Sequence, residues 1–206
     1  IPLNKYLDTS FFEPYKEATQ SVTKVANGTV LKYGVGQMRP AWEERSTDYP
    51  PLSTYKWADA EKALNQLAKA GAASPFDDIA LEYTNPHSGG SVMKTIACWI
   101  QMLRPGVHTQ AHRQVGSTVY CVFEGEGATI IDGQRFDWQT GDLFVIPSWA
   151  CHEHYNASTS ERAILFSIND MPVMKALGKY REEAYTEYNG HQVVTSMFKE
   201  KYSNII

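Results

Sequence analysis

The sequence predicts a mainly β protein whose strands form an antiparallel sandwich or barrel. From Ile79 onward, short runs of alternating apolar and polar residues follow one another at regular intervals. Asp132-Gly133 lies between two of these runs and is a strong signal for a two-residue hairpin. No segment between the runs is long and periodic enough to be a crossover helix, so a parallel sheet is disfavoured.

The first 77 residues differ from the rest, because charged, proline-containing connections surround a single clear helix. Apolar residues recur at spacings of three and four from Trp57 to Ala68, and Gly71 follows at the position where helices commonly end. An amphipathic helix of this kind buries its apolar side in a core. Residues 1–77 are therefore predicted to be an N-terminal arm whose helix packs on the barrel.

Residues 78–170 are predicted to form the barrel itself. Turn signals separate its expected strands, which are 79–83, 92–103, 118–123, 128–131, 134–138, 143–146 and 163–168. A short helix is expected to begin after Asp170 as its N-cap and to end near Gly178. The polar, tyrosine-rich residues that follow are expected to be an extended arm, so that 171–206 form a C-terminal helix and tail.

The composition excludes several classes of protein. The 206 residues are 43% hydrophobic and 20% charged, which rules out a disordered polyelectrolyte. The net charge is −4 and no basic run is long enough to follow a phosphate backbone, so no nucleic-acid partner is expected. The apolar runs are far shorter than a bilayer span, so no membrane partner is expected. Three widely spaced cysteines predict reduced thiols and a cytoplasmic location.

Four histidines lie close together in the sequence, at His108, His112, His152 and His154. Residues i and i+2 of a strand face the same side, so His112 and Gln114 are expected to point into the barrel, where a facing strand can bring His152. Such a trio leaves positions open on a divalent ion, as in non-haem Fe(II) oxygenases. His154 lies on the same strand face as His152. It could therefore be a fourth ligand or a hydrogen-bonding partner of bound substrate. The alternative is that His112 and His152 are ordinary interior histidines without a metal.

The spacing of these residues resembles the paired motifs of the cupin superfamily. In the first motif, Gly106 is followed after five residues by His112. In the second, the matching residues are Gly141, Pro147, His152 and Asn156. The resemblance implies a cupin-type antiparallel barrel, that is, a double-stranded β-helix or jelly roll.

The chain departs from the cupin motifs at three positions. Trp149 occupies the glycine position of the second motif, and Gln114 replaces the second histidine of the first. The glutamate position of the first motif falls at Ser117 or Thr118. An amide oxygen is a weak, neutral ligand, so two histidines and a glutamine would hold Fe(II) less tightly than three histidines.

Longer segments resemble a narrower family, the gentisate 1,2-dioxygenases. The similar segments are 82–86, 132–138 and 144–149, together with the cluster Ser-Trp-x-x-His-Glu-His at 148–154. Members of that family are bicupins, and this chain looks like their second, C-terminal half. Ile1 would then fall where the linker after a first cupin lies, which accounts for the missing initial methionine.

The resemblance implies a ring-cleaving dioxygenase that uses non-haem Fe(II) and dioxygen to open a small aromatic acid, as gentisate is opened to maleylpyruvate. His112, Gln114 and His152 would hold the iron, while His154 and Tyr120 would orient the substrate. Tyr120 stands where the family carries an arginine that pairs with the substrate carboxylate. A tyrosine hydroxyl offers one hydrogen bond and no charged fork. Substrate binding is therefore expected to be weaker or different.

Two other functions remain open at this point. The chain could be a metal-poor structural cupin half that completes an oligomer interface, with catalysis in a first cupin. The degraded first motif and Tyr120 favour this hypothesis, which makes a homo-oligomer or a partner cupin domain the expected partner. A sugar-binding or small-acid-binding cupin without redox chemistry shares the fold but has no further support in the sequence.

Overall fold

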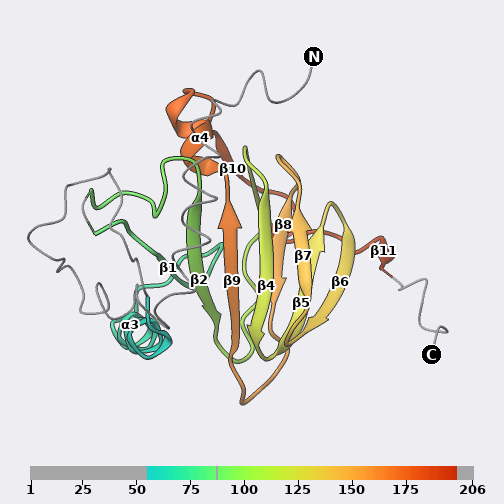
Figure 1. Cartoon of the computed structure of the whole chain (residues 1–206). Coiled ribbons are helices and arrows are strands. Elements are labelled where there is room, and N and C mark those ends of the chain that lie inside the picture. Colours follow the sequence, from blue (N-terminus) through green and yellow to red (C-terminus); the bar gives the residue numbers. More distant parts are fainter. Residues whose placement is uncertain (1–54, 87, 199–206) are drawn as a thin grey trace, which may run out of the picture. The chain divides into compact units, whose positions relative to one another are not determined.

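The computed structural model describes residues 55–86 and 88–198 (Figure 1). They belong to a compact unit, Tyr55–Ile206, which is distinct from the unit Ile1–Thr54. The connections expected at the start of the chain lie outside the described residues. In the described part, two β-sheets form the mainly β barrel that the sequence predicts. No helix of this part is long and apolar enough to cross a membrane.

One sheet has five strands in the order β1-β2-β9-β4-β7, all paired antiparallel. The strands are β1 (Ile79–Glu82), β2 (Ala97–Leu103), β4 (Thr118–Glu124), β7 (Leu143–Ile146) and β9 (Ala163–Asn169). Side chains alternate along a strand. Tyr120 and Val122 of β4 therefore face the barrel interior, whereas Val119 and Phe123 face outward and are exposed.

The other sheet has six strands in the order β10-β3-β8-β5-β6-β11. The strands are β3 (His112–Gln114), β5 (Glu126–Ile131), β6 (Gln134–Gln139), β8 (His152–Tyr155), β10 (Glu182–Ala184) and β11 (Ser196–Met197). The β11–β6 pair is parallel, so the tail adds one parallel pair at the edge of an otherwise antiparallel sheet. The long connection from β6 to β11, which includes β7 to β10, supplies the crossover that a parallel pair needs.

The hydrophobic core fills the space between the two sheets and extends under the helix α3 (Trp57–Lys69). The inner cluster comprises Leu103, Tyr120, Val122, Trp138, Ile146, Ala150, Ala163 and Leu165. The second cluster joins Leu64 of α3 to Ile79, Ile100 and Ile164 on the outer face of the five-stranded sheet. The predicted amphipathic helix is thus confirmed, and its stripe packs on the barrel beside β1 and β2 (Figure 1).

The predicted turns and the second helix are also present. Asp132 and Gly133 both have positive φ, 46° and 79°, as a two-residue hairpin with a type I′ turn requires. The helix α4 (Met171–Ala176) has Asp170 as its N-cap residue and ends before Gly178, as the sequence predicts. The Asp132-Gly133 hairpin and helix α4 therefore form where local sequence signals predict them.

The C-terminal tail is less independent than the expected arm. Its two short strands pair with opposite edges of the six-stranded sheet, β10 with β3 and β11 with β6. A short 3-10 helix, η3 (Tyr188–Gly190), lies between them. Backbone bonds from Ala111 to Gly190 and from Thr195 to Gly133 fix the crossing. The tail therefore crosses the outer face of this sheet from one edge to the other.

Replacing Gly127 by alanine is expected to destabilise the barrel by about 1–3 kcal/mol, because an added methyl group would overpack the sheet. A Cβ at Gly127 would overlap the ring edge of Trp138 and the carbonyl oxygen of Tyr155. Denaturant unfolding followed by tryptophan fluorescence measures the loss. Gly90→Ala is the control, since its nearest atom would be Ser88 Oγ at 3.6 Å. Equal stability of the two variants would contradict this account of the β5–β6 pair.

Candidate functional site

Strands β3 and β8 bring the predicted histidines together inside the barrel. His112 lies directly opposite His152 in the antiparallel register, and the centroids of the two rings are 4.4 Å apart. His154 follows on the same face of β8, with its ring centroid 5.8 Å from that of His152. All three side chains are buried. The i, i+2 spacing therefore produces the convergence on the interior that was expected.

Gln114 shares the inward face of β3 with His112 and is also buried. Its side-chain oxygen accepts a long hydrogen bond, 3.4 Å, from the hydroxyl of Tyr180. Arg113 lies between them in sequence and points the other way, where it pairs with Glu183 at 2.9 Å. The amide of Gln114 is thus placed toward the site, and Arg113 is not a partner for a substrate carboxylate.

Tyr120 reaches the same interior from the opposite sheet. Its ring stacks on Phe144 with centroids 5.0 Å apart and meets His154 edge to face at 5.1 Å. Burial, reinforced by the nearby Asp77, raises the pKa of the Tyr120 phenol well above its usual range. Tyr120 is therefore a neutral hydrogen-bonding group at physiological pH.

A buried chain of hydrogen bonds sets the tautomer of His154. The indole N–H of Trp138 donates to Thr129 Oγ1 at 2.9 Å, and Thr129 Oγ1 lies 2.9 Å from His154 Nδ1. Within the described residues these are the two partners of the Thr129 hydroxyl, and the Trp138 N–H can only donate, so the network favours the tautomer in which Thr129 donates to Nδ1. In that tautomer His154 carries its proton on Nε2, which faces away from this chain of bonds.

Three buried polar atoms lack a hydrogen-bond partner within residues 55–86 and 88–198: His112 Nδ1, His154 Nε2 and Trp99 Nε1. Trp99 lies on β2 and shares the inward face of that strand with Leu103 by alternation. Buried polar groups in folded proteins are normally hydrogen-bonded. Two of these atoms, His112 Nδ1 and His154 Nε2, belong to the histidine cluster inside the barrel, where a polar ligand or an ion would give them a partner.

The protonation states of the histidines suit metal coordination. Burial lowers the pKa of His112 to about 4, and burial together with the neighbouring His112 lowers that of His152 to about 4. Burial also lowers the pKa of His154 well below its ordinary value. Neutral imidazoles offer a free lone pair at pH 7, which a divalent ion requires. The imidazoles of His112 and His152 are therefore in the protonation state that a divalent metal needs.

The sequence did not identify several residues that line this site. The ring of Phe76 lies 4.8 Å from that of His112, and the Asp77 carboxyl is close enough to influence His152. Burial raises the pKa of Asp77, although a hydrogen bond from Ser74 opposes the shift. A serine three residues before an aspartate is a weak turn signal, and it gives no indication that the turn reaches the histidines.

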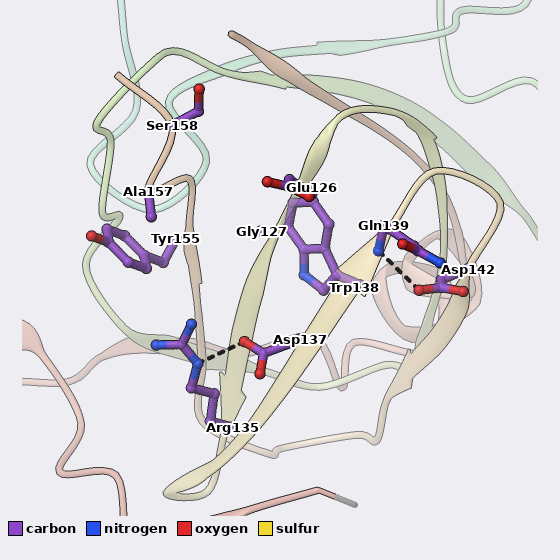
Figure 2. A pocket seen from close by; sticks show the side chains of 10 residues that line it. All are labelled: Glu126, Gly127, Arg135, Asp137, Trp138, Gln139, Asp142, Tyr155, Ala157 and Ser158. Carbon is purple, nitrogen blue, oxygen red and sulfur yellow. Dashed lines mark hydrogen bonds and ion pairs between the residues drawn. The ribbon is translucent and has the colours of Figure 1, made fainter. Parts of the chain in front are cut away.

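A separate groove of about 460 Å³ lies along β5, β6 and the end of β8, and its lining residues are drawn in Figure 2. Its polar side chains include Arg135, which pairs with Asp137 at 2.8 Å. None of the predicted site residues lines it. Trp138 lines the groove and also donates to the interior Thr129, so its ring lies between the two spaces. The chemistry of the histidines therefore belongs to the interior and not to this groove.

Comparisons with known proteins agree with this barrel. A family model described as a cupin domain matches residues 99–169. The chain is 42% identical to 5-aminosalicylate 1,2-dioxygenase of Comamonas sp, over 96% of this chain and 52% of the relative. It is 33% identical to gentisate 1,2 dioxygenase 1 of Aquipseudomonas alcaligenes, over 88% and 51%. A solved structure of salicylate 1,2-dioxygenase from Pseudoaminobacter salicylatoxidans matches with a TM-score of 0.65 and 31% identity, covering 78% of this chain and 44% of that one.

These similarities confirm the resemblance to gentisate-type dioxygenases and the cupin fold. The chain spans about half the length of the curated relatives it matches. The matched cupin-domain region includes His112, Gln114, Tyr120, His152 and His154.

Metal-free protein, prepared with a chelator, is expected to lose stability as the pH falls from about 6.5 to 4. The unfolded state takes up protons on His112 and His152 near pH 6.5, while the folded state resists until about 4. The stabilisation is therefore complete above pH 6.5 and lost below 4, on the order of 3 kcal/mol for each histidine. Denaturant unfolding at pH 7 and pH 4.5 measures it.

The variant His112→Gln provides the comparison for this pH dependence. Glutamine is neutral at every pH, so the variant is expected to lose less stability between pH 7 and pH 4.5 than the wild type, by up to about 3 kcal/mol. An identical loss in both proteins would show that the pKa of His112 is the same in the folded and unfolded states, which would contradict its lowering by burial.

Proposed function

Because the chain contains a cupin domain and is homologous to half the length of gentisate and salicylate 1,2-dioxygenases, we propose that it is the C-terminal cupin half of a ring-cleaving dioxygenase. The observation that carries the proposal is the convergence of neutral, buried His112 and His152 on an interior that also holds unpartnered polar atoms. The substrate class is a small aromatic acid, and the second substrate is dioxygen. The free thiols of Cys98, Cys121 and Cys151 support a cytoplasmic location.

The proposed metal is non-haem Fe(II), held by His112, Gln114 and His152. The two imidazoles lie side by side across the β3–β8 pair, and the Gln114 side chain is inward on the same strand as His112. When bound, Fe(II) supplies a Lewis-acidic, redox-active centre at which the aromatic acid and dioxygen react. The amide is a weaker ligand than a third imidazole, so this half is expected to bind iron less tightly than a three-histidine cupin.

His154 is proposed to orient the substrate and not to ligate the metal. Its Nδ1 accepts from Thr129, which leaves the Nε2–H as a buried donor without a partner in the described part of the chain. A carboxylate or phenolate oxygen of the substrate would satisfy this donor. Tyr120 adds one neutral hydroxyl, and its stacked neighbour Phe144 adds an apolar wall for an aromatic ring.

The names of the relatives define the substrate class more narrowly. Gentisate, salicylate and 5-aminosalicylate all carry a hydroxyl group beside the carboxylate on a benzene ring. Such a pair of oxygens can chelate one cation, and a donor such as His154 can bind the remaining lone pairs. In the proposed reaction both atoms of dioxygen enter the product as the ring opens between the two substituted carbons, as in the conversion of gentisate to maleylpyruvate.

A second function, a structural half that supports a catalytic partner, is favoured by the outer face of the five-stranded sheet. Large apolar side chains are exposed there along three adjacent strands: Val119 and Phe123 of β4, Leu143 and Val145 of β7, and Ile168 of β9. Contiguous exposed apolar surface typically marks an interaction site. A partner cupin domain or a second copy of this chain would cover it, which makes an oligomer part of this proposal.

Removing His152 tests the iron site. The full chain, loaded with Fe(II) under anaerobic conditions, is expected to hold iron and to consume oxygen when gentisate is added, and His152→Ala is expected to lose both. Metal content and an oxygen electrode measure them. Gln114→His restores a third imidazole and is expected to tighten Fe(II) binding by about tenfold or more. Full iron retention in His152→Ala would overturn the ligand set, and iron-free, inert wild type would favour the structural half.

Replacing His154 by alanine separates substrate orientation from metal binding. The variant is expected to keep its iron content while its KM for gentisate rises about tenfold or more, because a buried donor to the substrate is lost. Steady-state oxygen uptake and metal analysis on the same preparation measure both quantities. Thr129→Val, which removes the hydroxyl that sets the His154 tautomer, is expected to change KM in the same direction. Loss of iron in His154→Ala would instead make His154 a ligand.

A further inference from the structure

A second cluster of metal-ligating side chains lies outside the barrel, on the outer face of the six-stranded sheet. It consists of His108, Glu153 and His191, whose ligand atoms all lie within 4.8 Å of one another. Glu153 Oε2 is 3.4 Å from His108 Nε2 and 2.9 Å from His191 Nδ1. Glu153 sits between His152 and His154 on β8, so alternation turns it to the opposite face from those two histidines.

We propose that His108, Glu153 and His191 form a binding site for Zn²⁺ or a chemically similar divalent transition metal. Two imidazole nitrogens and one carboxylate oxygen are a donor set that zinc uses in proteins, with water in the fourth position. The two histidine rings lie close together, with centroids 4.3 Å apart, and both present a nitrogen to the same carboxylate oxygen. This site shares no ligand with the proposed iron site and does not depend on the proposed function.

The carboxylate is held in the orientation that coordination needs. Glu153 is fully buried, and its Oε1 accepts the backbone N–H of Gln192 at 2.9 Å. That bond leaves Oε2 facing the two imidazoles. Hydrogen bonds that fix a ligand in this way raise the affinity of metal sites. The buried negative charge also favours a cationic partner over a neutral one.

The backbones that carry the two histidines are fixed as well. His108 forms a β-bridge with Tyr155, and the next residue, Thr109, donates its N–H to the carbonyl of His154. On the tail, the carbonyl of Gly190 accepts from the N–H of Ala111 at 2.7 Å. All three ligands are therefore anchored to β8 or to the segment just before β3, so little ordering is left for the metal to impose.

The turn before His191 shows that its position is enforced. Tyr188, Asn189 and Gly190 have consecutive positive φ values of 46°, 58° and 86°. A left-handed conformation is unfavourable for Tyr188, and such strain persists where the surrounding structure requires it. Here the turn delivers His191 over Glu153. The side chains of His108 and His191 remain about one-third exposed, 37% and 35%, so an ion and a water ligand can reach them.

A metal at this site would clamp the C-terminal tail to the barrel. One ligand comes from the loop before β3, one from β8 and one from the tail, so the ion would join three segments that are distant in sequence. Without the ion, two hydrogen bonds to Glu153 hold this point of the tail. Binding is therefore expected to stabilise residues 185–198 more than the rest of the barrel.

The test is zinc binding by the full chain carrying His112→Ala and His152→Ala, which removes the proposed iron ligands. Calorimetric titration with Zn²⁺ is expected to show one site. Adding His191→Ala or Glu153→Gln is expected to weaken it by about 100-fold or more. Glu187→Gln, a carboxylate of the same tail that binds Tyr185, is the matched control and is expected to leave the affinity unchanged.

Two further readouts keep the test decisive if the double variant does not fold. In the wild-type background, His191→Ala is expected to reduce the bound Zn²⁺ by one equivalent and to remove the visible absorption of Co²⁺ bound at this site. Hydrogen exchange of residues 185–198 is expected to slow when Zn²⁺ is added to the wild type but not to His191→Ala. Unchanged stoichiometry and unchanged Co²⁺ absorption in His191→Ala would overturn the proposal.

Discussion

The alternation of side chains along β8 is the constraint on which the candidate sites depend. His152 and His154 face the interior while Glu153 faces the outer surface. A shift of one residue in register would exchange the two sets and destroy both clusters. Asn156, just after β8, fixes this register, because its buried side-chain amide donates to the backbone carbonyls of Leu103, Arg104 and Glu161. Asn156 of the second cupin motif therefore holds His152 and His154 in this register.

Burying polar nitrogens without hydrogen-bond partners lowers the stability of a barrel. Their presence in this interior therefore indicates a ligand. Two imidazole nitrogens, His112 Nδ1 and His154 Nε2, and the indole nitrogen of Trp99 are buried, and none of them has a hydrogen-bond partner within the described residues. An apolar replacement would stabilise the fold more than polar atoms without partners do. Burying these polar atoms lowers the stability of the fold unless a bound metal or polar substrate pairs with them. Neutral imidazoles are the protonation state that a metal requires.

Elements of the fold were predictable where local sequence patterns determine them. Residues of the candidate site were predictable only where they belong to a cupin motif. The Asp132-Gly133 hairpin and helix α3 follow from turn chemistry and periodicity, and the motif spacing placed His112 and His152 on facing strands. Glu153 and His191 were missed as a pair because 37 residues separate them and the tail strands are only two or three residues long. Strands that short leave no detectable period in a sequence.

The two main departures from the cupin motifs, Gln114 and Trp149, lie next to each other in the structure. Trp149 adopts φ 68°, the conformation for which the motif uses glycine, and donates its N–H to the carbonyl of Gln114 at 2.8 Å. Arg113 and Arg181 both lie 4.7 Å from the Trp149 ring, and Tyr180 bonds the Gln114 amide. Cation–π contacts and these bonds offset the strain of the tryptophan. Because Tyr180 and Arg181 belong to the tail, these contacts connect Gln114 and Trp149 to the docked tail.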